Sequence, residues 1–287
     1  MQVLWTHKNQ IDTKLRFHFI VVLGFNVENM LKIYSLRYKI RDDVEFNFYD
    51  GKKVEKDFKG IHPKGPGALA KFLLPHLLPE DIEKIIIFDT GDVLVLRDLS
   101  EMYNWNISDY SYMGSPDPGI GRMSKLLKKP YNVYINIGHF LLNIKKIKSE
   151  NMYKKYLKNK RVYTNDMICD QNLLNDLAQH QIGYLPIRFG LFAPFINDRE
   201  SDTPGIENQY EIYKMNEKLS KNANYYIPKN TYDYFKQSYN PVVIHQWNGK
   251  WQMGEGISIY RRLAQYYIRY AGIWNELCEK FPGYCEK

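Results

Sequence analysis

The sequence predicts an α/β domain whose sheet is mixed, mostly parallel and flanked by helices. Two observations support this prediction. An apolar run at 17–23 and an alternating run at 44–49 enclose an amphipathic stretch at 28–40, which is the order of a strand–helix–strand unit. The strand expected at 84–88 is apolar on both faces, as strands buried inside a parallel sheet are.

The remaining elements follow from residue spacing and turn residues. Large apolar residues recur with helical spacing between 67 and 78, so a helix is expected there, and Pro75 ends or kinks it. Further strands are expected at 93–96, 110–114, 134–138, 183–186 and 241–245, with another apolar run at 140–144, and further helices at 98–104, 147–158, 164–180 and 263–277.

The chain reads as one domain. It contains no internal repeat and no linker rich in Pro, Gly and Ser. We expect the main domain at 14–255, with a polar insertion or lid at 198–221. Residues 256–287 are expected to form a helical extension of the same domain, because apolar residues three or four apart continue there.

Composition excludes several classes of protein. Hydrophobic residues are 44% of the 287 and charged residues 25%, which excludes global disorder. Three Cys exclude a disulfide-rich scaffold, and no apolar stretch reaches the roughly 20 residues of a membrane-spanning helix. The net charge of +8 and the basic cluster at 154–161 leave a nucleic-acid-binding protein as an alternative, but no such module is recognisable.

The ends of the chain carry no targeting signal that we recognise. The apolar stretch at the N-terminus is too short for a secretory signal and has no cleavage site. We therefore expect a cytosolic protein or, if a targeting segment is missing, one of the ER or Golgi lumen. Cys278 and Cys285 flank a Pro-Gly turn and could pair in an oxidising lumen or remain thiols.

The segment most informative about chemistry is Asp89-Thr-Gly-Asp92, directly after the strand at 84–88. Open α/β sheets bind their ligands at the carboxyl ends of strands. Two neighbouring carboxylates repel each other, and a divalent cation such as Mg²⁺ or Mn²⁺ would resolve the conflict and bridge to a diphosphate. A turn in which Asp89 caps backbone amides is the alternative.

The residues from Asp89 to Leu99 resemble a motif of a known family. Asp89-Thr-Gly-Asp92, with Val93-Leu-Val-Leu-Arg-Asp-Leu99 after it, resembles the aspartate motif of family 8 glycosyltransferases. Other segments resemble that family's motifs in the same order: Lys71 in the preceding helix, Asn136 and Gly138 in an Asn-x-Gly segment, Asp170-Gln171 at a helix start, Leu185-Pro186, and His245 with Gly249, Lys250 and Trp251 at the close.

The resemblance implies a retaining sugar-nucleotide transferase with a GT-A fold. Such an enzyme would move a hexose or pentose from a UDP-sugar to a sugar or other hydroxyl acceptor, whose identity the sequence leaves open. The resemblance places a bound Mn²⁺ or Mg²⁺ on Asp89, Asp92 and His245, where it would offset charge on the leaving diphosphate.

The resemblance also assigns residues to the donor. Lys71 and Lys250 would add positive charge around the diphosphate, with Gly249 beside Lys250 in the closing motif. Asn26 would contact the base or ribose. Asn136 would bind ribose or sugar hydroxyls, and Gly138 would allow close approach. Asp170 and Gln171 would hold the donor sugar, and Asp170 would stabilise an oxocarbenium-like transition state.

Two departures from the family pattern leave alternatives open. The family has one residue between its two acids, whereas this chain has two, so either Asp89 or Thr90 completes the metal site beside Asp92. A bulge at Gly91 would restore Asp89. Lys250 follows His245 by five residues where the family has six, so its reach to the diphosphate is open as well.

Parts of the sequence also suggest two alternative functions. A catalytically weak or inactive UDP-sugar-binding protein of the same fold is consistent with both departures. A dinucleotide-binding enzyme is suggested by Gly65-Pro-Gly-Ala-Leu-Ala70, but that fingerprint must follow a strand directly, and here the nearest strand ends well before it.

Overall fold

The computed structural model describes residues 15–22, 26–28, 30–31, 43–62, 65–89, 93–117, 133–162, 169–192, 242–245, 275 and 279. Its helices and strands are β1 (Arg16–Val21), β2 (Glu45–Asp50), α3 (Lys52–Asp57), α4 (Ala70–Leu77), β3 (Lys84–Phe88), β4 (Val93–Val95), α5 (Ser100–Tyr103), β5 (Tyr112–Pro116), β6 (Ile135–Asn143), α7 (Ile144–Ser149), α8 (Met152–Asn159), α9 (Cys169–Leu177), β7 (Ile182–Tyr184), β8 (Leu191–Phe192) and β9 (Val243–His245).

The described strands form three hydrogen-bonded groups. The central group has the order β3-β6-β5-β7, in which β6 is antiparallel to both neighbours and β5 is parallel to β7. A second group pairs β1 with β2 in parallel, as the strand–helix–strand prediction requires. The third has the order β4-β9-β8 and contributes His245 from its middle strand.

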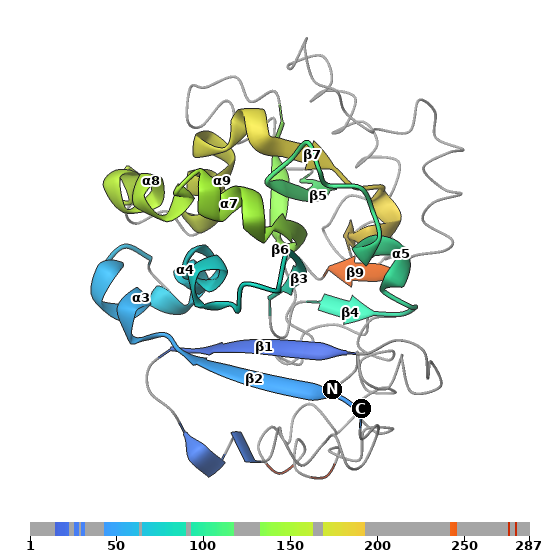
Figure 1. Ribbon diagram of the computed structural model, residues 1–287, viewed down its shortest axis with the longest axis horizontal. Coiled ribbons are helices and arrows are strands. Elements are labelled where there is room, and N and C mark those ends of the chain that lie inside the picture. Colours follow the sequence, from blue (N-terminus) through green and yellow to red (C-terminus); the bar gives the residue numbers. More distant parts are fainter. Residues whose placement is uncertain are drawn as a thin grey trace.

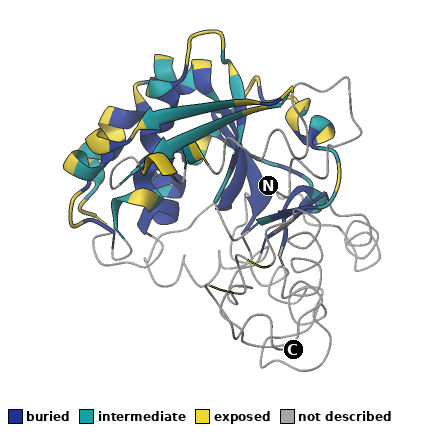
Figure 2. Ribbon diagram, turned by 90° about the horizontal axis from the view of Figure 1, so that it is seen from below, coloured by how far each residue is buried: buried dark blue, intermediate teal, exposed yellow. Residues whose placement is uncertain are grey.

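Helices cover one face of the central sheet. Helices α3, α4, α7, α8 and α9 gather on one side of β6, while β4, β9 and α5 lie on the other (Figure 1). The larger core fills the helical side and includes Phe58, Phe72 and Tyr156, whereas a smaller core around Met102 and Phe189 fills the opposite side. The outer faces of the helices are exposed and the central strands are buried (Figure 2).

Strand β6 is irregular where it matters for the site. Gly114 of β5 pairs with Phe140 of β6, and Pro116 of β5 pairs with Ile135 of β6. The stretch of β6 between these two pairs is longer than the matching stretch of β5, so β6 carries extra residues there. Bulges of this kind re-aim side chains and are frequent beside active sites. The two apolar runs predicted at 134–138 and 140–144 are therefore parts of one strand, and its irregular stretch, between Ile135 and Phe140, contains Asn136 and Gly138.

Two predicted helices differ in detail. The basic helix expected at 147–158 is two helices, α7 and α8, because Asn151 between them has φ 52° in the left-handed region. The helix expected at 67–78 begins as a 3₁₀ turn at Pro66–Leu69 and continues as α4. Pro75 lies inside α4 and the helix ends two residues later, so the predicted stop falls close to its place.

A buried amide of helix α9 makes two hydrogen bonds to the backbone of β6. The Asn175 side chain donates to the Ile135 carbonyl at 2.9 Å and accepts from the Ile135 N–H at 2.8 Å. Ile135 stands opposite Pro116 of β5, and the Asp117 N–H donates to the Tyr134 carbonyl at 3.0 Å, so the two residues form a non-hydrogen-bonded pair in which the polar backbone groups of Ile135 point away from β5. Asn175 therefore pairs backbone groups of β6 that β5 does not reach, and it sets the position of α9, whose second residue is Asp170.

Several predicted features lie outside the described residues. These are the insertion or lid at 198–221, most of the extension at 256–287, and both Cys278 and Cys285. Of the helices that the structure describes, none is long and apolar enough to cross a membrane.

The Asn175 contact predicts a stability change. Replacing Asn175 with Leu leaves both backbone groups of buried Ile135 unpaired, so we expect the free energy of unfolding to fall by about 3 kcal/mol. Urea denaturation measures it. Asn159→Leu, at the end of α8 where the side chain bonds to the Lys155 carbonyl of its own helix, is the control and should change stability little. Equal losses in the two variants would contradict this account of α9.

Candidate active site

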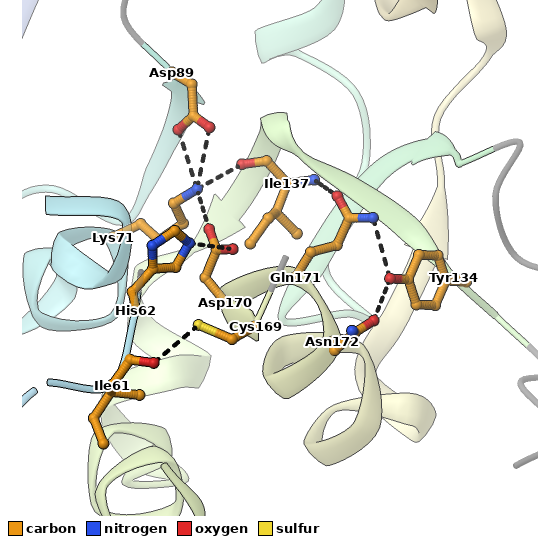
Figure 3. A network of polar contacts seen from close by, with 10 residues as sticks. All are labelled: Ile61, His62, Lys71, Asp89, Tyr134, Ile137, Cys169, Asp170, Gln171 and Asn172. Atoms are coloured by element: carbon orange, nitrogen blue, oxygen red, sulfur yellow. Dashed lines mark hydrogen bonds and ion pairs between the residues drawn. The ribbon is translucent and has the colours of Figure 1, made fainter. Parts of the chain in front are cut away.

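The site is built around the ammonium group of Lys71, near the start of α4. Its Nζ lies 3.1 Å from Asp89 Oδ1, at the end of β3, and 3.1 Å from Asp170 Oδ2, in the first turn of α9. It also donates to the Ile137 carbonyl of β6 at 3.2 Å (Figure 3). One buried cation thus joins two carboxylates from separate elements, across 18 and 99 residues of sequence.

The environment keeps Lys71 charged. Burial alone would lower the pKa of its ammonium group, but the carboxylates of Asp89 and Asp170 outweigh that effect and raise the pKa above its ordinary value. The Asp170 side chain is only 12% exposed, while that of Asp89 is 40% exposed. Asp170 is therefore the carboxylate that depends more on Lys71, and Asp89 keeps a face open to solvent.

A second cluster of polar groups lies beside the first. Asp117, two residues past Ser115 of β5, accepts from Asn136 Nδ2 and from Gln171 Nε2, each at 3.0 Å. Asn136 Oδ1 accepts the Gly138 N–H at 2.8 Å, and Gln171 Oε1 accepts the Ile137 N–H at 3.3 Å. The protein thus fixes which way both amides point, because exchanging oxygen and nitrogen would break these bonds.

The network continues into α9. Gln171 Nε2 also donates to the Tyr134 hydroxyl at 3.2 Å, and that hydroxyl donates to Asn172 at 2.5 Å (Figure 3). Cys169 is buried and its thiol donates to the Ile61 carbonyl at 3.9 Å, as expected of a structural cysteine.

His245 lies beside this region at the end of β9. A Cβ added to Gly138 would stand 2.7 Å from His245 Nε2, so the imidazole lies against the glycine of the predicted Asn-x-Gly segment. The backbone N–H of Asp89 donates to the Gly138 carbonyl at 2.7 Å. Gly138 therefore has Asp89 on one side and His245 on the other, which explains why this position requires a glycine.

Burial sets the protonation state of His245. It lowers the pKa of the imidazole to about 4, and the positive charge of Lys71 acts in the same direction. At neutral pH the ring is uncharged and can present a nitrogen lone pair to a cation.

The structure brings most of the predicted residues together. Lys71, Asp89 and Asp170 are in direct contact, Asn136 and Gln171 share Asp117, and Gly138 contacts His245. Asn26 is exposed after β1, where its carbonyl accepts the Met30 N–H and starts a helical turn. Asp92, Gly249 and Lys250 lie outside the described residues.

Sequence reasoning missed three residues of the site. Asp117 follows a strand end just as Asp89 does, but its Pro-Asp-Pro-Gly context looks like a plain turn. His62 lies 3.8 Å from Asp170 Oδ1 through its Nε2, and no motif marks it in the sequence. His139 is fully buried next to Gly138 and packs on His245, but in the sequence it is one polar residue within a strand.

The donor set fits a divalent cation. Asp89 offers a half-exposed carboxylate and His245 a neutral imidazole, on two sides of Gly138. Oxygen and imidazole ligands together suit Mn²⁺. The part of the chain that the structure describes shows no group of three His, Cys, Asp or Glu that could hold a metal, and Asp92, the third predicted ligand, is outside it.

Comparison with known proteins identifies the family. A sequence profile described as glycosyl transferase family 8 matches residues 3–250, most of the chain. The chain belongs to glycosyl transferase family 8. The family prediction made from the ordered motifs is thereby confirmed.

Individual relatives are distant. A Haemophilus influenzae protein described as a glycosyltransferase is 31% identical over 124 residues, which cover 42% of this family 8 chain and 37% of that protein. The galactosyltransferase LgtC, solved with donor and acceptor sugar analogues, is 16% identical at a TM-score of 0.64, covering 94% of this chain and 90% of LgtC.

Two further structures share the fold. The bifunctional glycosyltransferase WbbM is 15% identical at a TM-score of 0.63, covering 91% of this chain but 45% of WbbM. The glycosyltransferase GlyE of Streptococcus pneumoniae is 15% identical at a TM-score of 0.58, covering 97% of this chain and 60% of GlyE. The chain thus spans less than half of the Haemophilus protein and of WbbM. At these identities the structural likeness shows the fold alone, and it confirms the predicted GT-A class.

The Lys71 contacts predict a charge-dependent loss of stability. Lys71→Met leaves the buried Asp170 carboxylate without its main counter-charge, so we expect the free energy of unfolding to fall by about 3 kcal/mol or more. Lys52→Met removes an exposed lysine 3.7 Å from Asp50 and should cost roughly 0.5 kcal/mol or less. Thermal or urea denaturation measures both, and a Lys71→Met variant as stable as Lys52→Met would disprove the buried charge triad.

The buried imidazoles predict weakening in acid. His245 has a folded pKa of about 4, and burial also lowers the pKa of His139, with His245 adding to the effect. Unfolded histidine takes up a proton near pH 6.5, so the unfolded state binds more protons between about pH 6.5 and 4 and stability falls as the pH falls through that window. The loss in urea midpoint between pH 7.5 and 5 should shrink in His245→Gln and persist in His180→Gln, an exposed control. Identical pH dependence in all three proteins would contradict it.

Proposed function

We propose that this family 8 chain is a retaining glycosyltransferase that moves a hexose or pentose from a UDP-sugar to a hydroxyl acceptor with the help of a divalent metal. The single observation that carries the proposal is the Lys71 bridge. It joins the strand end that would face the diphosphate, at Asp89, to the helix start that would face the donor sugar, at Asp170.

The bridge suits the electrostatics of such a reaction. When a sugar leaves its diphosphate, negative charge grows on the leaving group and positive charge grows on the anomeric carbon. Lys71 supplies fixed positive charge beside the first, and the buried Asp170 carboxylate supplies fixed negative charge beside the second. Because the two groups hold each other in place, little reorganisation is needed as the charges develop.

The amide groups would bind the sugar. Asp117 fixes the orientation of Gln171 and Asn136, and both side chains are nine-tenths buried. Each retains a hydrogen-bonding site that no bond among the described residues fills, since an amide offers two N–H groups and two oxygen lone pairs. Groups held in this way select hydroxyl positions on a ligand without losing side-chain entropy.

A divalent cation would be held by Asp89, His245 and Asp92, the last by the family resemblance. When bound, it would supply positive charge opposite the departing diphosphate. The neutral state of His245 at physiological pH is compatible with this role.

The acceptor is assigned to segments outside the described residues. We propose that the insertion at 198–221 and the extension at 256–287 select it. Gly249 and Lys250 remain proposed donor contacts on the closing motif, and Asn26 a proposed contact to the base or ribose.

A UDP-release assay tests the proposed activity. With UDP-glucose, UDP-galactose, UDP-xylose and UDP-N-acetylglucosamine as donors, we expect slow release with at least one donor, lost on chelation and restored by Mn²⁺. Asp170→Asn should lower the rate about 100-fold or more, because a preorganised charge is removed. Asp92→Ala should abolish the metal response. Asp176→Asn, further along the same helix, is the matched control.

The outcomes separate the rival functions. UDP binding without release from any donor would favour a sugar-nucleotide-binding protein without activity. Release that is as fast in Asp92→Ala as in the unchanged protein would show that the metal assignment is wrong, even if transfer occurs.

A further inference from the structure

We propose that His139 is a positioning residue for His245: its buried imidazole packs on that of His245 and holds it toward the end of β3. This inference rests on the proposed function, in which His245 is a metal ligand. The resemblance to family 8 assigns no role to His139. Burying a polar imidazole costs free energy, and the proposed role explains why a histidine stands at this buried position.

The first observation is the contact itself. The two imidazole rings have their centroids 5.1 Å apart and their planes tilted by 42°. His139 is 0% exposed and His245 is 6% exposed, so the contact excludes water. Buried side chains occupy single rotamers when their neighbours leave no other space, and here each ring packs against the other.

The second observation is a pair of glycines. A Cβ on Gly190 would overlap Nε2 of His139 and the hydroxyl of Ser115, and a Cβ on Gly138 would stand 2.7 Å from Nε2 of His245. Each ring therefore occupies the space that a side chain would need at its own glycine. A larger residue at Gly138 would displace the His245 ring, and one at Gly190 would displace the His139 ring.

The third observation is how each backbone is held. His139 pairs with Phe88 in the central sheet, one residue before Asp89. His245 pairs with Val93 of β4 and Phe192 of β8 in a separate sheet. The ring contact therefore joins two sheets, and it ties the orientation of His245 to the strand that carries Asp89.

Metal binding measures the effect directly. In the presence of UDP, free Mn²⁺ is counted by its electron paramagnetic resonance signal, and Mg²⁺ is measured by competition. We expect His139→Val to weaken Mn²⁺ binding about 10-fold or more, the usual effect of losing a group that orients a ligand. Mg²⁺ binding should change far less, because imidazole favours transition metals over Mg²⁺.

Two variants separate packing from other roles. His139→Phe keeps a flat buried ring and should retain most of the Mn²⁺ affinity. Gly190→Ala pushes the His139 ring without altering it and should weaken Mn²⁺ binding as His139→Val does. Thermal melting of each variant checks that it is folded, and the ratio of Mn²⁺ to Mg²⁺ affinity is insensitive to a general loss of folded protein.

The results are decisive in each case. An unchanged ratio in both His139→Val and Gly190→Ala would overturn the positioning role while leaving the proposed function intact. An equal loss in His139→Phe and His139→Val would also overturn it, because a nitrogen atom rather than a ring would then be required. Failure of the unchanged protein to bind Mn²⁺ with UDP would overturn the proposed metal site and this inference with it.

Discussion

The ammonium group of Lys71 is the constraint on which the rest of the site depends. Removing Lys71 would leave the buried Asp170 carboxylate without its main counter-charge, which costs far more than a surface ion pair contributes. The elements that carry Asp89 and Asp170 are therefore fixed relative to each other by electrostatics, and Ile137 of β6 adds a backbone carbonyl to the same cation. Helix α4 supplies this cation from within the larger core, so the position of the charge follows from apolar packing.

The irregular stretch of β6 places further polar groups beside the Lys71 ion pairs. In a regular strand, successive side chains would alternate between the two cores. Here the extra residues interrupt the alternation, and Asn136, Gly138 and His139 fall within the interruption. Asn175 pairs the backbone groups of Ile135, which point away from β5. The extra residues in β6 thus place polar groups next to the proposed donor site. Side-chain hydrogen bonds stabilise this irregular stretch of the strand.

Much of the fold and part of the site could be predicted from the sequence. The strands at the start of the chain and at 84–88 have strong apolar patterns, and Lys71, Asp89 and Asp170, which the sequence predicted for one site, are in contact. The split between α7 and α8 could not be predicted, because it depends on a left-handed Asn151 in a stretch of helical spacing. The roles of Asp117 and His139 could not be predicted either, since they arise from contacts between residues far apart along the chain.

A double-mutant cycle between Lys71 and Asp170 tests the central claim most directly. The free energy of unfolding is measured for the unchanged protein, Lys71→Met, Asp170→Asn and the double variant. If the two groups neutralise each other in the interior, the double variant is more stable than the sum of the single losses predicts, by about 1–3 kcal/mol. Losses that add to within about 0.5 kcal/mol would show that the two residues do not interact, and the account of the site would be wrong.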